Sequence, residues 1–135
     1  MATIRILLVD DFAPFRSYVC RIFEEHPKWQ VVGEAADGIT ALQKAKDLQP
    51  DVILLDVNLP LLHGIEVAQQ LGVMVPGCKI LFLSAHSAPD TVQAAFAAGA
   101  WGYVIKWNTD RDLLRAMEAV MAGKQFLSER LAGQA

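Results

Sequence analysis

Short apolar runs alternate along this chain with segments whose apolar residues recur at helical spacing. Three of the runs predict strands, at residues 4–9, 52–55 and 80–83. The last two contain no alternating polar residues, which is typical of strands that are covered on both faces. Weaker strand patterns lie at residues 31–36, which we place at an edge of the sheet, and at residues 103–105.

Five segments between and after these runs have the apolar spacing of amphipathic helices. Pro14 suits the first turn of the first helix, and Asp37 directly precedes the second. The third helix is expected to cover residues 64–71, with Gly72 as its C-terminal cap.

The last two helices are expected to begin near hydroxyl residues, with Ser87 capping the fourth and Thr109 opening the fifth. Gly123 is expected to end the fifth helix. Strand and helix therefore alternate five times, which predicts an α/β fold with a parallel sheet. Right-handed crossovers between parallel strands place helices on both faces of such a sheet.

The composition agrees with one compact domain. The chain has 135 residues, of which 53% are hydrophobic and 20% charged, and this balance excludes disorder and low complexity. The formal net charge is −3, and no basic run suggests direct binding of nucleic acid. Cys20 and Cys78 form no Cys-x-x-Cys pattern, so neither a disulfide framework nor a thiolate metal site is expected. No apolar stretch reaches about 18 residues, so we expect no membrane span and a cytoplasmic location.

Polar residues follow four of the five predicted strands. Asp10 and Asp11 follow the first strand, Asp56 the third, Ser84 the fourth and Lys106 the fifth. In open parallel sheets, ligands bind outside the carboxyl ends of the strands. Taken singly, each of these residues is readily explained as a turn former, a cap or a solvated loop residue. Their convergence on one edge of the sheet favours a functional site.

The charges of this set indicate its chemistry. Three carboxylates and one lysine leave a formal charge of −2 in one pocket. Like charges at short range raise each other's pKa or need a cation. A few protein oxygens, with water completing an octahedron, suit Mg²⁺. We therefore expect phosphoryl transfer onto a carboxylate, with the metal and the lysine balancing the charge of the phosphoryl oxygens.

In this order, the residues resemble the receiver domain of two-component response regulators. The resemblance covers residues 4 to about 126 and rests on these pieces: the acidic pair Asp10-Asp11, the run 51–56, Leu59-Pro60 with Gly64 after it, and residues 83–85, 99–100 and 102–106. It implies a five-stranded, doubly wound, flavodoxin-like sheet of order 2-1-3-4-5 with five helices. The receiver domain would span residues 1–126, and residues 127–135 would begin a linker or form a tail.

The same resemblance assigns roles around a Mg²⁺ ion and a phosphoryl group. Asp56 matches the position that accepts phosphate from a partner histidine kinase, and Lys106 matches the lysine that pairs with that phosphate. Asp11 matches the direct metal ligand, while Asp10 acts largely through water. Asp56 itself and the backbone carbonyl of Asn58 match the remaining protein ligands of the metal.

Two further positions match the switch of the family, and neither is singled out by its own chemistry. Ser84 matches the switch hydroxyl, which also contacts the phosphate, and Tyr103 matches the switch aromatic. In the family, they move together on phosphorylation and remodel a surface used by the output. By its residue type alone, a tyrosine in a strand is usually half-buried, with its hydroxyl in water. The chain is then a signalling switch and not an enzyme, apart from catalysing its own phosphorylation and dephosphorylation.

Three positions depart from the family pattern. Trp107 stands after Lys106, where many members have proline with a cis bond, so this loop is expected to be either trans or strained. His63 replaces the usual aspartate before Gly64, which we interpret as a tolerated loop change. His86 lies two residues after Ser84, and a surface loop histidine is the favoured interpretation because it follows no metal-ligand spacing.

The C-terminal part resembles a subset of the family, the LuxR-type transcription regulators. This resemblance rests on residues 102–106, 113–117 and 122–128. It implies a helix-turn-helix DNA-binding domain after a linker, outside this chain, and dimerisation that strengthens on phosphorylation. A stand-alone receiver, acting by protein contacts or in a phosphorelay, is the alternative.

Three other classes share parts of the pattern. A flavodoxin-like cofactor binder needs a hydroxyl- and glycine-rich loop after the first strand, where residues 10–14 instead offer two acids and a proline. A phosphohydrolase with an aspartate nucleophile would have a spaced Asp-x-Asp and a cap over its substrate. A receiver-like module that is never phosphorylated would lack the acidic pair, Asp56 or Lys106, and all are present.

Overall fold

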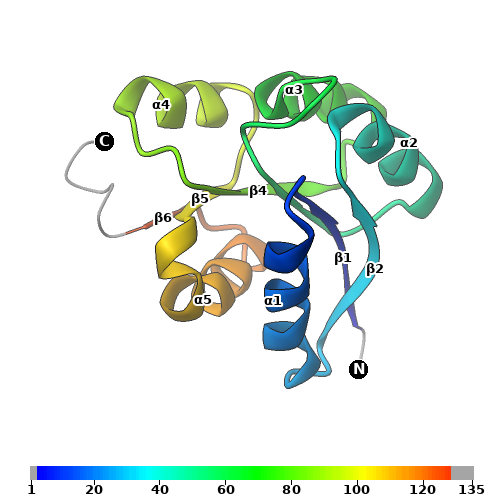
Figure 1. Ribbon diagram of the computed structural model, residues 1–135, viewed down its shortest axis with the longest axis vertical. Helices are drawn as coiled ribbons and strands as arrows, with labels where there is room; N and C mark the ends of the chain where they lie inside the picture. Colours follow the sequence, from blue (N-terminus) through cyan, green and yellow to red (C-terminus); the bar gives the residue numbers. More distant parts are fainter. Residues whose placement is uncertain (1–2, 129–135) are drawn as a thin grey trace.

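A parallel sheet forms the middle layer of the molecule (Figure 1). The structure is a computed structural model that describes residues 3–128. The strands are β1 (Ile4–Val9), β2 (Trp29–Ala35), β3 (Val52–Leu55), β4 (Lys79–Ser84), β5 (Gly102–Ile105) and β6 (Phe126–Leu127). All neighbours pair in parallel, in the order β2-β1-β3-β4-β5-β6. The expected order of the first five strands is confirmed, and β2 lies at an edge as expected.

The prediction of five strands was wrong, because the described chain forms a sixth. In β6, Phe126 lies opposite Gly102 and Leu127 opposite Tyr103. Two residues are too few to show a strand period in the sequence. The pairing also depends on Gly102, where a Cβ atom would lie 2.5 Å from Cδ1 of Leu81 and 3.3 Å from the carbonyl oxygen of Phe126. Residues 129–135, most of the expected linker or tail, lie outside the described residues.

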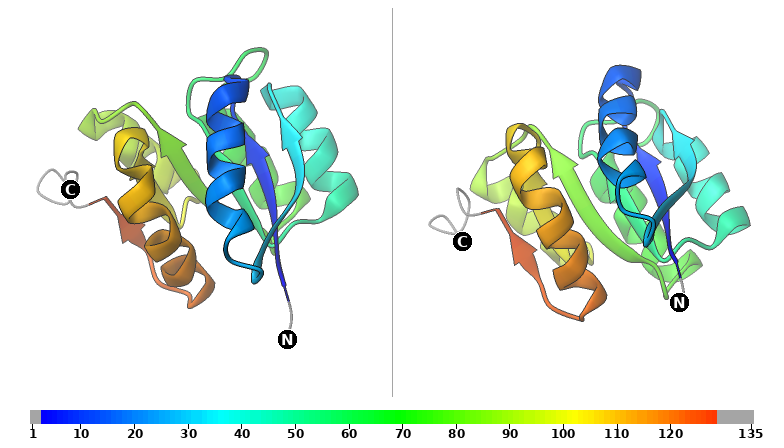
Figure 2. Two further views of the ribbon diagram at one scale, coloured as in Figure 1. Left: turned by 60° about the horizontal axis from the view of Figure 1, so that its bottom comes forward. Right: turned by 90° about the horizontal axis from the view of Figure 1, so that it is seen from below.

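Helices cover both faces of the sheet (Figures 1 and 2). One face carries α1 (Ala13–Glu24) and α5 (Thr109–Met121), and the other carries α2 (Gly38–Leu48), α3 (Gly64–Met74) and α4 (Pro89–Ala97). A short 3₁₀ turn, η1 (Lys106–Asn108), joins β5 to α5. Within residues 3–128, no helix has both the length and the apolar character that crossing a membrane requires.

The expected helix ends were partly wrong. The side chain of Asp37 does precede and cap α2, accepting a hydrogen bond from the backbone N–H of Thr40 at 2.7 Å. Gly72 is not a cap: α3 continues to Met74, and the cap residue Val75 is buried, so packing extends the helix past the glycine. Ser87 does not cap α4 either, since the N-cap is Ala88, directly before Pro89.

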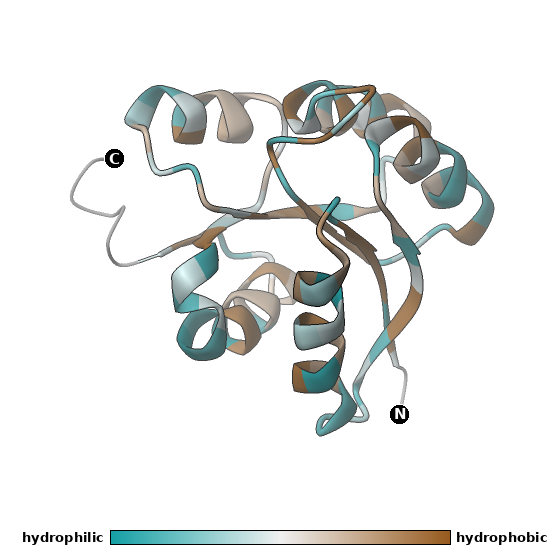
Figure 3. Cartoon of the chain, viewed as in Figure 1, coloured by the Kyte–Doolittle hydropathy of each residue, from teal (hydrophilic) through white to brown (hydrophobic). Residues whose placement is uncertain are grey.

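Alternate residues of each buried strand face the two helical layers. In β1, Leu7 and Val9 pack in the cluster with α2, α3 and α4, whereas Ile6 and Leu8 pack in the cluster with α1 and α5. Figure 3 shows the resulting apolar middle layer, with the polar parts of the helices turned outward. Because both faces of the sheet are covered, polar side chains of the central strands reach solvent only at the strand ends.

Candidate functional site

Three carboxylates meet at the carboxyl ends of β1 and β3. Asp10, Asp11 and Asp56 each offer one oxygen such that these oxygens all lie within 4.8 Å of one another. Asp10 is 1% exposed and Asp56 is 5% exposed, while Asp11 is open to solvent. This is the only such group of possible metal ligands among residues 3–128. The set of carboxylates expected to converge is therefore brought together, and its donors are the hard oxygens that Mg²⁺ prefers.

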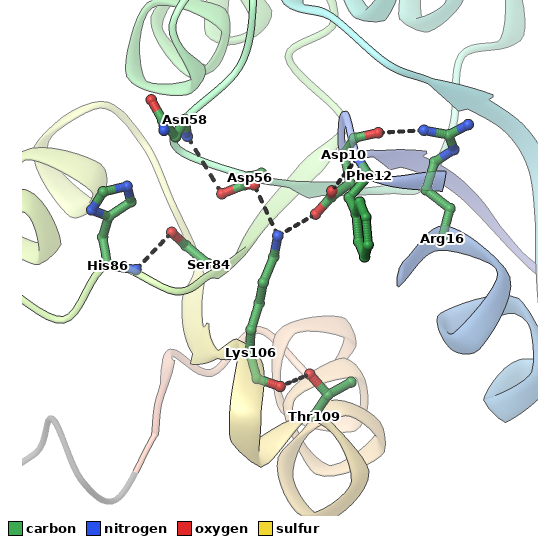
Figure 4. Close-up of polar contacts among 9 residues, drawn as sticks. All are labelled: Asp10, Phe12, Arg16, Asp56, Asn58, Ser84, His86, Lys106 and Thr109. Carbon is green, nitrogen blue, oxygen red and sulfur yellow. Dashed lines mark hydrogen bonds and ion pairs between the residues drawn. The ribbon is translucent and has the colours of Figure 1, made fainter. Parts of the chain in front are cut away.

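Lys106 bridges the two buried carboxylates (Figure 4). Its Nζ lies 2.6 Å from Oδ2 of Asp10 and 3.0 Å from Oδ2 of Asp56. The same Nζ lies 4.7 Å from the centre of the Phe15 ring of α1, within the range of a cation–π contact. The lysine is thus held at the centre of the site and not solvated at a loop end.

Burial and charge pairing compete in setting the pKa values here. Burial raises the pKa of Asp10, and although the hydrogen bonds from Lys106 and from the Phe12 N–H lower it, the net pKa lies above its ordinary value. Burial lowers the pKa of Lys106, but the hydrogen bonds to Asp10 and Asp56 outweigh it, so this pKa is raised. The lysine is therefore fully charged near neutral pH, whereas Asp10 takes up a proton more readily than a solvated aspartate.

Backbone hydrogen bonds hold the two buried acids, Asp10 and Asp56, in place. The N–H of Asp10 donates to the carbonyl of Ala35, and Oδ1 of Asp10 accepts from the N–H of Phe12 at 2.9 Å. The N–H of Asp56 donates to the carbonyl of Val9 at 3.1 Å. These bonds tie the end of β1 to its neighbours on both sides.

The loop after β3 approaches Asp56 closely. The N–H of Asn58 lies 3.4 Å from Oδ1 of Asp56, and the N–H of Gly64 donates to the carbonyl of Val57 at 2.8 Å. A Cβ atom at position 64 would collide with the carbonyl oxygen of Asp56, so only glycine fits there. Leu61, in the same loop, adopts a left-handed φ of 69° and is 78% exposed.

Ser84 and Tyr103 both contact the backbone of one residue, His86. The Oγ of Ser84 accepts from the N–H of His86 at 3.1 Å, and the hydroxyl of Tyr103 donates to the carbonyl of His86 at 2.7 Å. Both side chains are completely buried, and the Tyr103 ring stacks on Phe82. Tyr103 is therefore not the half-buried, water-facing residue that its type suggests, and burial raises its pKa.

The structure shows where the three residues that depart from the family pattern, Trp107, His63 and His86, lie. The Lys106–Trp107 bond is trans, since residues 3–128 contain no cis peptide, and Trp107 is 50% exposed in η1. His63 is more than a tolerated change, because its Nδ1 accepts the N–H of Ile65 and caps α3. His63 and His86 both line a cavity of about 280 Å³ beside Asn58.

Two residues near the acids have no role that the sequence reveals. The pattern marks Phe15 only as part of the apolar stripe of the first helix, yet its ring lies beside Lys106. Arg16 donates a hydrogen bond to the backbone carbonyl of Asp10 (Figure 4). The only sequence signal of Arg16 is its place near the start of the helix after the acidic pair, and that place is equally typical of solvent-facing residues.

The response regulator receiver domain family matches residues 6–118. The chain belongs to this family. Receiver domains accept phosphoryl groups in signalling and are not classical enzymes.

The relatives of this receiver domain are regulators of LuxR/NarL type. It is 36% identical over 126 residues to the nitrate/nitrite response regulator protein NarL of Escherichia coli (strain K12), covering 93% of this chain and 58% of that protein. It is 33% identical over 128 residues to the transcriptional regulatory protein DegU of Brevibacillus brevis, covering 95% of this chain and 54% of DegU. This receiver domain thus spans little more than half the length of either relative.

A solved structure agrees with this assignment. The LuxR-family two-component response regulator from Aurantimonas sp. SI85-9A1 superimposes with a TM-score of 0.92 at 35% identity, over 98% of this chain and 94% of that chain. The receiver domain is thus similar in backbone as well as in sequence to this subfamily.

Proposed function

We propose that Asp56 is the phosphoacceptor of this receiver domain. The observation that carries the proposal is the position of Asp56, buried at the end of β3 between Lys106 and two further carboxylates. A carboxylate oxygen of Asp56 forms a bond to phosphorus, while the bond between phosphorus and the leaving group of the donor breaks. The leaving group keeps the electron pair and is protonated by solvent. The donor is a partner histidine kinase, as for receiver domains in general.

The acidic cluster is proposed to hold Mg²⁺. Asp11 and Asp56 would bind it directly, together with the backbone carbonyl of Asn58, and Asp10 would act largely through water. The exposure of Asp11 beside two buried acids supports this division, because an ion reaches the cluster from the solvent side. When bound, Mg²⁺ balances the charge of the carboxylates and of the phosphoryl oxygens.

Lys106 and Ser84 are proposed to bind the phosphoryl group. Lys106 is already 3.0 Å from Asp56, and its four-carbon stem lets Nζ move from the carboxylate to a phosphoryl oxygen. The Ser84 hydroxyl now accepts from the N–H of His86. Reorientation toward a phosphoryl oxygen would alter that contact and shift the backbone of His86, whose carbonyl accepts from the Tyr103 hydroxyl.

Through the backbone of His86, Ser84 and Tyr103 would transmit phosphorylation to an output surface. The name of DegU, a transcriptional regulatory protein, supports an output in transcription. A DNA-binding domain outside this chain, and a homodimer that strengthens on phosphorylation, complete the proposal. This chain would bind no nucleic acid itself and would act in the cytoplasm. A stand-alone receiver is the alternative, and the names of the relatives favour the transcriptional one.

Intact-mass spectrometry tests the proposed phosphoacceptor. The chain, incubated with Mg²⁺ and acetyl phosphate, should gain the mass of one phosphoryl group, and Asp56→Asn should gain none. Asp51→Asn is the matched control, because Asp51 precedes the other end of the same strand. Undiminished labelling of Asp56→Asn would disprove the assignment, as would absence of labelling in the unaltered chain.

A further inference from the structure

Arg16 connects the acidic pocket to the edge strand β2. Its Nη1 donates to the backbone carbonyl of Asp10 at 2.6 Å, and its Nε pairs with Oε1 of Glu34 at 2.9 Å. The Arg16 side chain is 18% exposed, so most of it is packed between α1 and β2. Figure 4 shows the guanidinium reaching the Asp10 backbone on the side away from Lys106.

The carbonyl that Arg16 contacts belongs to the peptide between Asp10 and Asp11. Rotation of this peptide would redirect the chain at both acids, and therefore both carboxylates. The N–H of Asp10 is fixed by Ala35, and its side chain by Phe12 and Lys106. Among residues 3–128, the hydrogen bond from Arg16 is the contact found on this peptide's carbonyl. This hydrogen bond fixes the orientation of the Asp10–Asp11 peptide, which lies beyond the end of β1 and so outside the hydrogen-bond pattern of the sheet.

We propose that Arg16 is a positioning residue for the metal pocket, holding the Asp10–Asp11 peptide so that both carboxylates face the ion. The proposal rests on the proposed Mg²⁺ site. A planar guanidinium can serve Glu34 and the carbonyl together, because its donors form a rigid fork. Glu34 contributes indirectly, because its ion pair with Arg16 anchors the guanidinium to β2.

The sign of the effect on Mg²⁺ affinity separates positioning from charge. Arg16 is a cation near an acidic pocket, so by charge alone it repels Mg²⁺, and its removal would tighten binding. By positioning, its removal loosens the peptide and weakens binding. Partners that orient metal ligands typically change metal affinity by about 10-fold to 100-fold when mutated.

Calorimetric titration of the chain with MgCl₂ measures this effect. Arg16→Met should weaken Mg²⁺ binding by about tenfold. Arg16→Lys should also weaken it, because an ammonium group lacks the rigid fork, although it keeps the charge. Glu34→Gln should weaken it less, since the amide oxygen still accepts from Nε. At saturating Mg²⁺, the rate of labelling by acetyl phosphate should return close to that of the unaltered chain.

Lys28→Met is the matched control, because it removes the cation of an exposed ion pair with Glu118 that has no contact with the pocket. Its Mg²⁺ affinity should be unchanged. Equal or tighter binding by folded Arg16→Met would overturn the inference. If that variant does not fold, Arg16→Lys decides, because it keeps the charge: unchanged Mg²⁺ affinity with a lowered melting temperature would mean that Arg16 is structural only. If the unaltered chain binds no Mg²⁺, the proposed metal site fails instead.

Discussion

The Nζ of Lys106 lies closer to Asp10, at 2.6 Å, than to Asp56, at 3.0 Å. The lysine thus contacts both the proposed metal pocket and the proposed phosphoacceptor. A cation that binds in the proposed pocket would share the carboxylates of Asp10 and Asp56 with Lys106. Such binding would redistribute charge in the site, and the expected behaviour of Lys106→Ala follows from this.

The carboxyl of Asp10 should titrate above its ordinary pKa of 3.8, because burial raises it more than Lys106 lowers it. Carboxyl ¹³C NMR over pH 2–8 measures this directly. The exposed Asp37 is the internal control, since the hydrogen bond from the Thr40 N–H lowers its pKa. A pKa of Asp10 at or below that of Asp37 would contradict the prediction.

The same shift sets the sign of two pH effects. The folded state holds the Asp10 proton more tightly than the unfolded state, so ionised Asp10 lowers the free energy of unfolding above its folded pKa. The free energy of unfolding therefore rises again as the pH falls through the raised pKa of folded Asp10 toward 3.8, the ordinary value of the unfolded state. Mg²⁺ affinity should fall over the same interval, because protonated Asp10 no longer attracts the ion.

Lys106→Ala should remain folded but become more dependent on Mg²⁺. The substitution leaves the carboxylates of Asp10 and Asp56 without their common cation. Mg²⁺ should therefore raise the melting temperature of the variant more than that of the unaltered chain, and labelling should slow. Thermal unfolding with and without about 10 mM Mg²⁺ measures the effect, because a ligand that binds only the folded state raises the melting temperature. An equal Mg²⁺ shift in both proteins would count against competition between Lys106 and the ion.

Intrinsic fluorescence should change on adding Mg²⁺, and again on adding beryllofluoride. Trp107 is joined to Lys106, so its indole senses movement of that peptide. Trp29 and Trp101 lie at the amino ends of β2 and β5, the opposite end of the sheet, and should give a constant background. Trp107→Phe should remove most of the response while labelling persists. Retention of the full response in that variant would show that the indole does not report on the site.

A buried contact between α5 and the segment after β6 should contribute measurably to stability. The Ser128 hydroxyl donates to Oδ2 of Asp112 at 2.9 Å and accepts from the N–H of Ile105 at 3.1 Å. Asp112→Ala leaves the hydroxyl without this acceptor and should lower the free energy of unfolding by about 1–3 kcal/mol. Urea denaturation of the variant and of the unaltered chain measures this difference in the free energy of unfolding.

Asp110→Ala is the control for Asp112→Ala. Asp110 lies in the same first turn of α5 but is exposed, so both variants lose the same favourable charge near the helix N-terminus. The excess cost of Asp112→Ala then belongs mainly to the buried contact with Ser128, because the ion pairs of Asp112 with Arg111 and Arg115 involve exposed arginines and contribute little. Equal losses in the two variants would show that the contact adds no stability.

Local patterns were enough to predict the five main strands and the position of the acidic site, whereas the order of the strands followed only from the resemblance to receiver domains. Runs such as 52–55 are apolar throughout, and a parallel sheet brings every strand's carboxyl end to one edge. The placement of Asp10, Asp56 and Lys106 follows from those two facts. Their roles in phosphoryl transfer stay predictions.

Features that depend on contacts across long sequence distances emerged only in the folded structure. No periodicity marks the two-residue strand β6, the backbone contacts of His86 with Ser84 and Tyr103, or the contact of Arg16 with Asp10. Each arises because packing brings backbone donors and acceptors to side chains whose neighbours the chain order does not reveal. Periodicity reports which face of an element is buried, whereas hydrogen-bond partners are chosen by the three-dimensional arrangement of the elements.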